Sequence, residues 1–174
     1  MKIVGLDLSL TATGVAVIVN DIHQVYTLSN KLMGPERLIA IRDQVLLHCA
    51  KANLIVIEGY AFARPNQAHQ IGELGGVIRT ALHEAGHKYI EVQPTALKKF
   101  ATGKGGANKI GVAVAIAKRY GVQFKNDNEY DAFGLAQIGL AFSGITNSQT
   151  MFQQEVIDEL RGVKITKKRK KKVR

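Results

Sequence analysis

The sequence predicts an α/β layered domain built on a mixed five-stranded sheet, three antiparallel strands followed by two parallel ones, flanked by helices. Near the N-terminus, three short segments rich in Val, Ile, Leu and Tyr are separated only by polar turns, which indicates successive antiparallel strands. Helical and strand-like segments alternate after them, an order typical of layered α/β domains. With 174 residues, 46% of them hydrophobic, the chain is long enough to bury one core.

The first four elements follow from apolar spacing. Strands are expected over residues 2–8, 14–20 and 24–28, joined by turns at 9–13 and 21–23. Pro35 and Glu36 then begin a helix that runs to about Ala50, because Leu38, Ile41 and Val45 recur at helical spacing.

The remaining elements complete the alternation. The continuous apolar run from Leu54 to Glu58 indicates a strand buried on both faces. A helix over residues 66–85, ended by Gly86, precedes a strand over 88–92, and Pro94 begins a short helix that stops near Gly103. Two more helices, over about 107–120 and 127–142, are expected to complete the core.

The net charge of +10 is unevenly distributed. Residues 161–174 hold nine of the 24 Lys and Arg residues and no acid, so residues 1–160 carry 15 basic against 14 acidic side chains. We therefore expect one domain over residues 1–160 and a disordered basic tail over 161–174. A second basic block without acids lies between Gln93 and Lys125. Such clustering is typical of a polyanion binder, whereas the simpler interpretation is a solvated helix face and a solubilising tail.

Cysteine usage and hydropathy suggest the compartment. The single Cys49 excludes an intramolecular disulfide, fits a reducing compartment and is expected to be buried in a helix. The sequence has no apolar run of 18 residues, and a strand-like segment starts at Lys2 where a signal peptide would place a charged and then an apolar region. We expect a soluble cytoplasmic protein without a membrane span.

Three carboxylates stand in apolar surroundings: Asp7 in the first strand, Glu58 at the end of the fourth, and Asp131 in the last predicted helix. An unpaired buried carboxylate is costly or becomes protonated, whereas converging carboxylates are held ionised by divalent cations with oxygen ligands. Ligand sites in open sheets lie at the carboxyl ends of strands, so Asp7 and Glu58 can face one site. Asp127 or Asn128 shares the helical face of Asp131.

Four segments carry a family resemblance: GLDLSLTATGVAV, IVIEGYAF, VQPTALKKFATGKGGANK and NEYDAFGLA. They resemble the signature regions of the RuvC family of Holliday junction resolvases in the RNase H-like superfamily, in the same order over residues 3–143. The resemblance implies an RNase H-like fold and a homodimer that makes paired, symmetric nicks in four-way or other branched DNA. It also implies two Mg²⁺ ions per site, replaceable by Mn²⁺, and the cytoplasm of a bacterium or a virus-infected host cell.

The resemblance assigns three of four metal ligands to Asp7, Glu58 and Asp131. The fourth ligand is open: the family usually has Asp or His at the position of Asn128, so either Asn128 ligates through its neutral oxygen or Asp127 replaces it. The first motif has Leu8 and Ser9 where the family often has Pro and Gly, a variation that resembles virus-encoded members.

The chemistry of phosphodiester hydrolysis explains these residue types. Two metals about 3.5–4 Å apart stabilise the attacking and leaving oxygens together. We expect Asp7 on the central strand to bridge them, with Glu58 on one and Asp131 on the other. Lys109 would stabilise the transition-state phosphate and Lys98 would grip it. Taken singly, each lysine is more simply a surface charge; their separation around Gly103 matches the family.

Further residues are candidates for DNA contact. Tyr60 and Phe62 follow Glu58 and either stack on unpaired bases or pack internally. The residues 103–109 offer backbone amides to phosphate but lack the spacing of a Walker loop. The basic residues expected to contact DNA are Lys99, Lys104, Lys109 and Lys118 in the folded block and Lys167, Lys168 and Arg169 in the tail.

Three other interpretations compete with a nuclease. His83, Glu84 and His87 spell the H-E-x-x-H zincin motif, but Gly86 is expected to end the helix before His87. The lack of an acid at Asn128 makes a catalytically impaired relative that binds branched DNA conceivable. LDLSLTATG also resembles the phosphate loop of ASKHA phosphotransferases, which need two such domains and more residues than 174.

Overall fold

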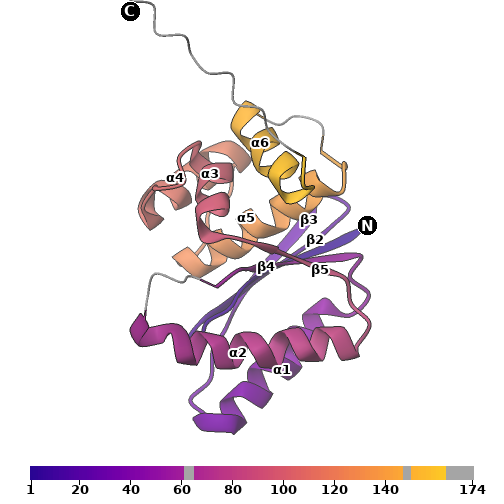
Figure 1. Ribbon diagram of the computed structural model, residues 1–174, viewed down its shortest axis with the longest axis vertical. Helices are drawn as coiled ribbons and strands as arrows, with labels where there is room; N and C mark the ends of the chain where they lie inside the picture. The colour runs from indigo at the N-terminus through magenta and orange to yellow at the C-terminus, as the bar shows by residue number, and fades with distance from the viewer. Residues whose placement is uncertain (61–64, 147–149, 164–174) are drawn as a thin grey trace, which may run out of the picture.

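A five-stranded sheet lies between two layers of helices (Figure 1). This computed structural model describes residues 1–60, 65–146 and 150–163, and gives the backbone alone for 65–71. The helices α1 (Gly34–Cys49) and α2 (Pro65–Glu84) cover one face of the sheet, and α3 (Pro94–Thr102), α4 (Lys109–Tyr120), α5 (Asp127–Phe142) and α6 (Met151–Leu160) lie on the other (Figure 1).

The sheet has the predicted composition. Its strands are β1 (Lys2–Asp7), β2 (Thr13–Val19), β3 (Ile22–Leu28), β4 (Leu54–Glu58) and β5 (Tyr89–Val92), in the order β3-β2-β1-β4-β5. The first three pair antiparallel, and β4 pairs parallel with both β1 and β5. The predicted RNase H-like fold class is therefore confirmed, and every predicted element is present with ends within two residues of the expected ones.

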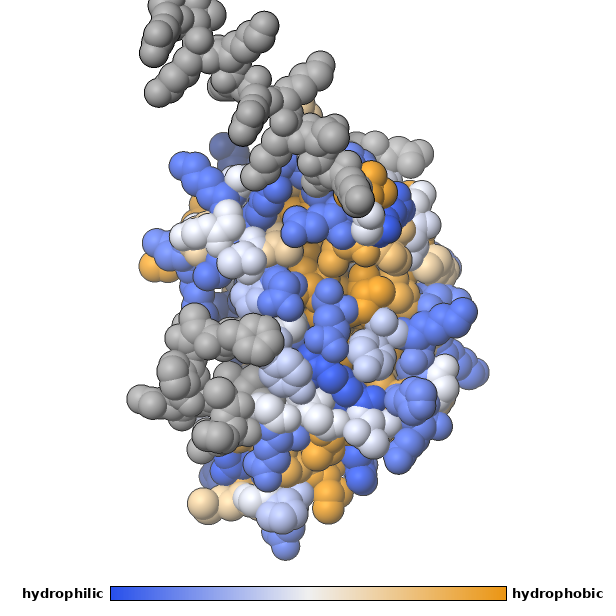
Figure 2. Space-filling view, viewed as in Figure 1, coloured by the Kyte–Doolittle hydropathy of each residue, from blue (hydrophilic) through white to orange (hydrophobic). Residues whose placement is uncertain are grey.

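The helix α6 was not predicted. A capping box between Thr150 and Gln153 begins it, and its residues Val156 and Ile157 are fully buried. Two polar contacts fix it to neighbouring helices: Arg119 donates to Gln153 at 2.9 Å, and Lys99 pairs with Glu155 at 2.8 Å. Figure 2 shows hydrophilic side chains over most of this face, with apolar side chains gathered between α6 and β5.

Two apolar cores form because successive strand residues point to opposite faces. Ile3, Ala16 and Val56 pack against the layer of α3 to α6, whereas Val4, Val15 and Ile57 pack against α1 and α2. The helix α5 is buried on nearly all sides because it lies between the sheet and the other helices of its layer. Because it is buried on nearly all sides, α5 is not divided into an apolar and a polar face.

Glycines allow α5 to lie in main-chain contact with the sheet. A Cβ on Gly5 would lie 2.1 Å from the carbonyl oxygen of Ala132, and one on Gly14 would lie 2.2 Å from that of Asn128. Gly5 belongs to β1 and Gly14 to β2, so the first turns of α5 pass directly over both strands.

Cys49 is buried at the end of α1, as predicted, and burial raises the pKa of its thiol to about 12. The thiol is therefore a packing group. In the part of the chain that the structure describes, no helix is both long and apolar enough to cross a lipid bilayer.

Candidate active site

Asp7 and Glu58 end two adjacent parallel strands. The register of β1 on β4 pairs Gly5 with Val56 and Leu6 with Ile57, so Asp7 and Glu58 follow as the next neighbours. Neighbouring strands lie about 4.8 Å apart. Both carboxylates continue the rows of residues that face α5, because Ile3 and Val56 belong to the core on that side. The sheet alone therefore places the two acids side by side.

Asp131 joins them from α5. Its helical neighbours Asn128 and Ala132 are the residues whose carbonyls lie against Gly14 and Gly5. Gly14 is in turn the β2 partner of Asp7, so this part of α5 lies over the end of β1. The charge of Asp131 acts on both Asp7 and Glu58. The three acids are therefore near enough for their charges to interact.

Burial raises the pKa of all three acids, and the charges of neighbouring acids raise it further at Asp7 and Glu58. The pKa of Asp7 lies well above its ordinary value, through burial first and then the charges of Glu58 and Asp131. Burial raises the pKa of Glu58 to about 7, aided by the charge of Asp131. Burial likewise raises the pKa of Asp131 to about 6. A side-chain hydrogen bond joins the carboxyls of Asp7 and Glu58, so the two titrate as a pair.

The donor set fits a hard divalent cation in its chemistry. Carboxylates from β1, β4 and α5 act on one another through their charges, and a bound cation would relieve the repulsion that raises the pKa of Asp7 and Glu58. Among residues 1–60, 65–146 and 150–163, no three His, Cys, Asp or Glu side chains stand in an arrangement that could already hold an ion.

Two lysines lie at the same place. The charge of Lys98, on α3, lowers the pKa of both Glu58 and Asp131, and so does that of Lys109, the first residue of α4. Gly103 ends α3 with a left-handed φ of 82°, and Asn108 caps α4 by accepting the amide of Gly111 at 2.8 Å. These two caps turn the chain so that both lysines approach the acids.

The two candidates for the fourth ligand, Asp127 and Asn128, have different neighbours. Lys109 forms a short ion pair with Asp127, which lowers the pKa of that carboxyl. Asp127 is thus already paired with the ammonium group of Lys109. Both Asp127 and Asn128 lie on the helical face of Asp131, four and three residues before it. Asn128 lies close to the strands through its carbonyl over Gly14.

A polar network that the sequence analysis missed fixes the start of α5. Asn126 caps the helix by accepting the amide of Glu129 at 3.0 Å, and the buried Glu129 accepts the hydroxyl of Thr27 at 2.7 Å and the amide of Lys125 at 2.8 Å. The network joins β3 to α5 one turn before Asp131. The spacing of Asn126 and Glu129 is that of a capping box, and this signal in the sequence could have revealed it.

The turn after Asp7 is closed by a side chain. Thr13, which is fully buried, accepts the amide of Ser9 at 3.0 Å and donates to the Ser9 carbonyl at 2.6 Å. The chain that leaves β1 is thereby fixed two residues beyond the carboxylate.

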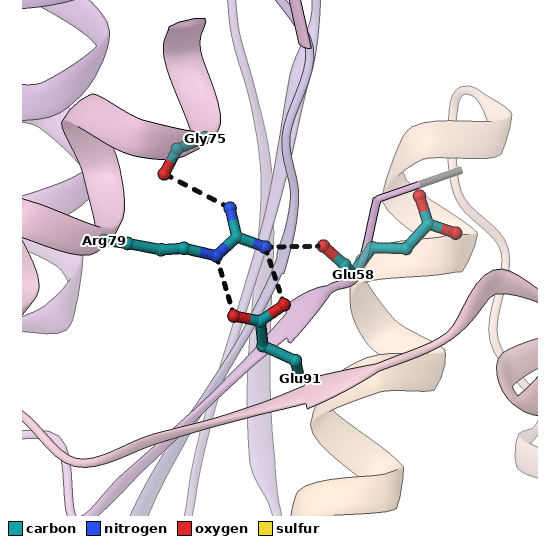
Figure 3. A network of polar contacts seen from close by, with 4 residues as sticks. All are labelled: Glu58, Gly75, Arg79 and Glu91. Carbon is teal, nitrogen blue, oxygen red and sulfur yellow. Dashed lines mark hydrogen bonds and ion pairs between the residues drawn. The ribbon is translucent and has the colours of Figure 1, made fainter. Parts of the chain in front are cut away.

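A second missed network holds the end of β4. Figure 3 shows Arg79 of α2 between Gly75, Glu91 and the backbone carbonyl of Glu58, while the Glu58 side chain points away from the guanidinium. Arg79 and Glu91 are joined by two hydrogen bonds, at 2.9 and 3.1 Å. The ring of Tyr60 lies 4.3 Å from the guanidinium carbon.

Comparison with known proteins now decides the family. The family profile described as crossover junction endodeoxyribonuclease RuvC matches residues 3–138. The chain belongs to the RuvC family. The matched stretch begins in β1 and ends in α5, so it includes the three acids and both lysines but not α6.

Individual proteins are similar to this chain in sequence or in fold. The crossover junction endodeoxyribonuclease RuvC of Gloeobacter violaceus is 28% identical over 152 residues, which are 80% of this chain and 87% of that protein. Thermus thermophilus RuvC has the same fold, with a TM-score of 0.65 at 24% identity over 83% of this chain and 97% of that one. The fowlpox virus resolvase, solved with substrate Holliday junction DNA, has a TM-score of 0.51 to this chain at 13% identity. The match covers 84% of this chain and 100% of that one.

The predicted DNA contacts occupy different environments. Lys104 and Lys118 are exposed, whereas Lys99 is engaged by Glu155 of α6. Tyr60 is half-buried against Arg79, which supports the packing alternative for one face of its ring. The remaining predicted contacts lie outside the described residues: Phe62, Lys167, Lys168 and Arg169.

The zincin motif is not assembled. The helix α2 ends at Glu84, and Gly86 has a φ of 72°, so His87 lies beyond the helix that carries His83. The two histidines therefore do not share a helical face, as the motif requires.

Proposed function

We propose that this RuvC-family protein is a divalent-metal-dependent endonuclease that resolves four-way DNA junctions by paired, symmetric nicks. The observation that carries the proposal is the convergence of Asp7, Glu58 and Asp131 within a domain of this family. Relatives support the substrate: Thermus thermophilus RuvC was solved in complex with Holliday junction substrate, with a TM-score of 0.64 to this chain at 24% identity over 78% of this chain and 90% of that one.

The three acids would hold two Mg²⁺ ions, with Mn²⁺ as a substitute. Asp7, on which the charges of both other acids act, would bridge the ions, Glu58 would bind one and Asp131 the other. When bound, the ions supply an activated water and charge stabilisation at both reacting oxygens of the phosphodiester. Asn128 is the better candidate for the remaining ligand, because Asp127 is paired with Lys109.

The lysines would act on the phosphate. The positive charges of Lys109 and Lys98 act on Glu58 and Asp131. Their ammonium groups would bind the phosphate, whose negative charge grows in the transition state. Lys109 must exchange Asp127 for the phosphate, or hold both. Its partner Asp127 thus holds the lysine in the site before DNA arrives.

The wider DNA surface would be formed by Lys104, Lys118 and the basic tail. Paired nicks need two such sites, so we propose that the protein acts as a homodimer whose two copies cut opposite strands of one junction.

The decisive experiment is Asp7→Asn, tested for cleavage and binding on a synthetic four-way junction. Cleavage should be lost and junction binding kept, because the carboxylate serves the chemical step. The exposed Asp43, which pairs with Arg42 on α1, offers a matched control: Asp43→Asn should cleave like the wild type. Loss of binding and of the fold together with cleavage in Asp7→Asn would count against the proposal.

A second candidate is a catalytically impaired relative that binds branched DNA. Asn128, which offers no charge where an acid or His is usual in the family, favours it. Incubation of the wild-type protein with junction, fork and linear duplex in Mg²⁺ separates the two candidates. Nicking confined to the junction supports the resolvase, and binding without any nicking supports the impaired relative.

A further inference from the structure

Arg79 joins three elements at the end of β4 that carries Glu58. From α2 it donates to the Glu58 carbonyl at 3.4 Å and to the Gly75 carbonyl at 3.2 Å. Its two hydrogen bonds to Glu91 reach β5, the strand beside β4. One guanidinium thus contacts α2, β4 and β5 together.

The contact is specific to arginine. The Arg79 side chain is only 12% exposed, and its planar guanidinium meets both carboxylate oxygens of Glu91 while a face lies over the Tyr60 ring. A lysine ammonium can supply the charge but neither the fork nor the stacking plane. Burial of this kind distinguishes the pair from surface ion pairs, which contribute little.

Gly75 keeps space for the same cluster. A Cβ at this position would lie 2.7 Å from the Arg79 nitrogen and 2.7 Å from the Tyr60 hydroxyl. The backbone of α2 is therefore shaped around the guanidinium and the ring. This is a second, independent observation that the arrangement is built into the fold.

Arg79 acts on Glu58 through the main chain. The guanidinium binds the carbonyl, and the carboxyl points the other way, toward the layer of α5 (Figure 3). The cation is neutralised by Glu91, and the largest charge effects on the Glu58 carboxyl come from Asp131 and Lys109. Arg79 therefore affects where the Glu58 carboxyl lies, and not its charge.

We propose that Arg79, locked by Glu91, is a positioning residue that fixes the end of β4 and so aims the Glu58 carboxylate at the metal site. The inference rests on the proposed function, since it assumes that Glu58 is a ligand. The guanidinium of Arg79 also contacts the ring of Tyr60, two residues after Glu58.

The test is Arg79→Met, which keeps the length of the side chain and removes the fork. Metal binding is measured by calorimetry with Mn²⁺ on the DNA-free protein, and cleavage by single-turnover assays across a Mg²⁺ series. We expect the Mn²⁺ dissociation constant and the Mg²⁺ concentration for half-maximal cleavage to rise about tenfold, as for other groups that orient ligands. Junction binding in EDTA should not change.

Arg79→Lys and Glu91→Gln sharpen the outcome. Lysine keeps the charge without the fork, so it should not restore metal affinity, whereas Glu91→Gln should shift affinity in the same direction by less. Glu91→Gln also serves as the test if Arg79→Met does not fold. The matched control is Arg42→Met, which removes the exposed Arg42–Asp43 pair of α1 and should leave metal affinity unchanged.

Two results would overturn the inference. One is an Arg79→Met protein that melts at a lower temperature but binds Mn²⁺ as the wild type does, which assigns Arg79 to stability alone. The other is full metal affinity in Arg79→Lys. Failure of the proposed function is recognised separately, because it shows as a wild-type protein that cleaves no junction, whatever its variants do.

Discussion

Gly5 of β1 and Ala132 of α5 are in direct main-chain contact, with room for no side chain between them: an added Cβ would lie 2.1 Å from the Ala132 carbonyl oxygen. The contact lies two residues before Asp7 on the strand and one residue after Asp131 on the helix. The approach of the helix to the strand therefore sets how far apart the two acids stand.

Gly5→Ala should destabilise the protein and separate the acids. Because the clash is with backbone, the helix must shift, and overpacking of this kind costs about 3 kcal/mol. Denaturant unfolding measures the destabilisation, and Mn²⁺ affinity should fall with it. A Cβ added to Gly76 of α2 would meet nothing within 4 Å, so Gly76→Ala is the control and should be neutral or slightly stabilising. Equal stability of the two variants would contradict the close approach.

The raised pKa values predict that metal-free stability falls with pH. The ordinary values are 4.5 for Glu58 and 3.8 for Asp131, and their folded values are about 7 and about 6. Between the ordinary and folded values the unfolded chain has released protons that the folded chain keeps, so stability declines as pH rises through this window and levels off above it. Melting in EDTA from pH 4 to 8 measures the decline.

Asp7→Asn serves as the reference in that series. It removes the most buried carboxyl of the three, so its melting temperature should exceed that of the wild type at neutral pH, by about 2–4 °C for each kcal/mol relieved in a chain of this size. Mg²⁺ should raise the melting temperature of the wild type and not that of the variant. A wild-type melting temperature that stays constant from pH 4 to 8 in EDTA would contradict the prediction.

Asn128→Asp should add a fourth carboxylate to the site. We expect tighter Mn²⁺ binding by calorimetry and a lower metal-free melting temperature, because a further charge joins acids that already repel one another. Asp127→Asn is the companion variant. It should leave metal affinity nearly unchanged and free Lys109. The reverse ranking would make Asp127 the ligand.

Lys98 and Lys99 are adjacent in sequence but should differ in effect. The positive charge of Lys98 acts on Glu58 and Asp131. Lys98→Ala should therefore slow cleavage by about a hundredfold, as expected when one group that stabilises a transition state is removed. Lys99 pairs with Glu155, so Lys99→Ala should cleave normally with slightly lower stability. Single-turnover rates at saturating junction compare them, and similar rates would refute the distinction.

Deletion of residues 164–174 should weaken binding to all DNAs alike. The segment holds eight Lys and Arg residues, and the log–log salt dependence should flatten by about 0.9 for each phosphate that the shortened protein no longer neutralises. Affinity measured against salt concentration, for junction and linear duplex, gives the slope. An unchanged slope would show that the tail does not bind DNA.

The sheet and its acids could be predicted because their signals are local. Alternating apolar residues fix which face Asp7 and Glu58 share, and a glycine after each helix marks where α2 and α3 stop. Asp131 could be placed because the apolar residues that follow it predict a helix.

Interactions between distant side chains could not be predicted in this way. The Arg79–Glu91 pair joins a helix to a strand, and neither residue has a sequence pattern that requires the other. The pairing of Lys109 with Asp127 depends on the conformation of the residues after Gly103, so the choice between Asp127 and Asn128 stayed open. The helix α6 was missed although its apolar residues recur at helical spacing, at Phe152, Val156, Ile157 and Leu160, a pattern that could have revealed it.

The bare main chain beneath α5 also limits how this catalyst can be re-engineered. Grafting Asp7, Glu58 and Asp131 onto another scaffold would fail wherever a side chain occupies the positions of Gly5 and Gly14. That side chain would hold the helix away from the sheet, so the acid on the helix would lie too far from the other two. A designer would have to transplant the two empty places first and the acids second.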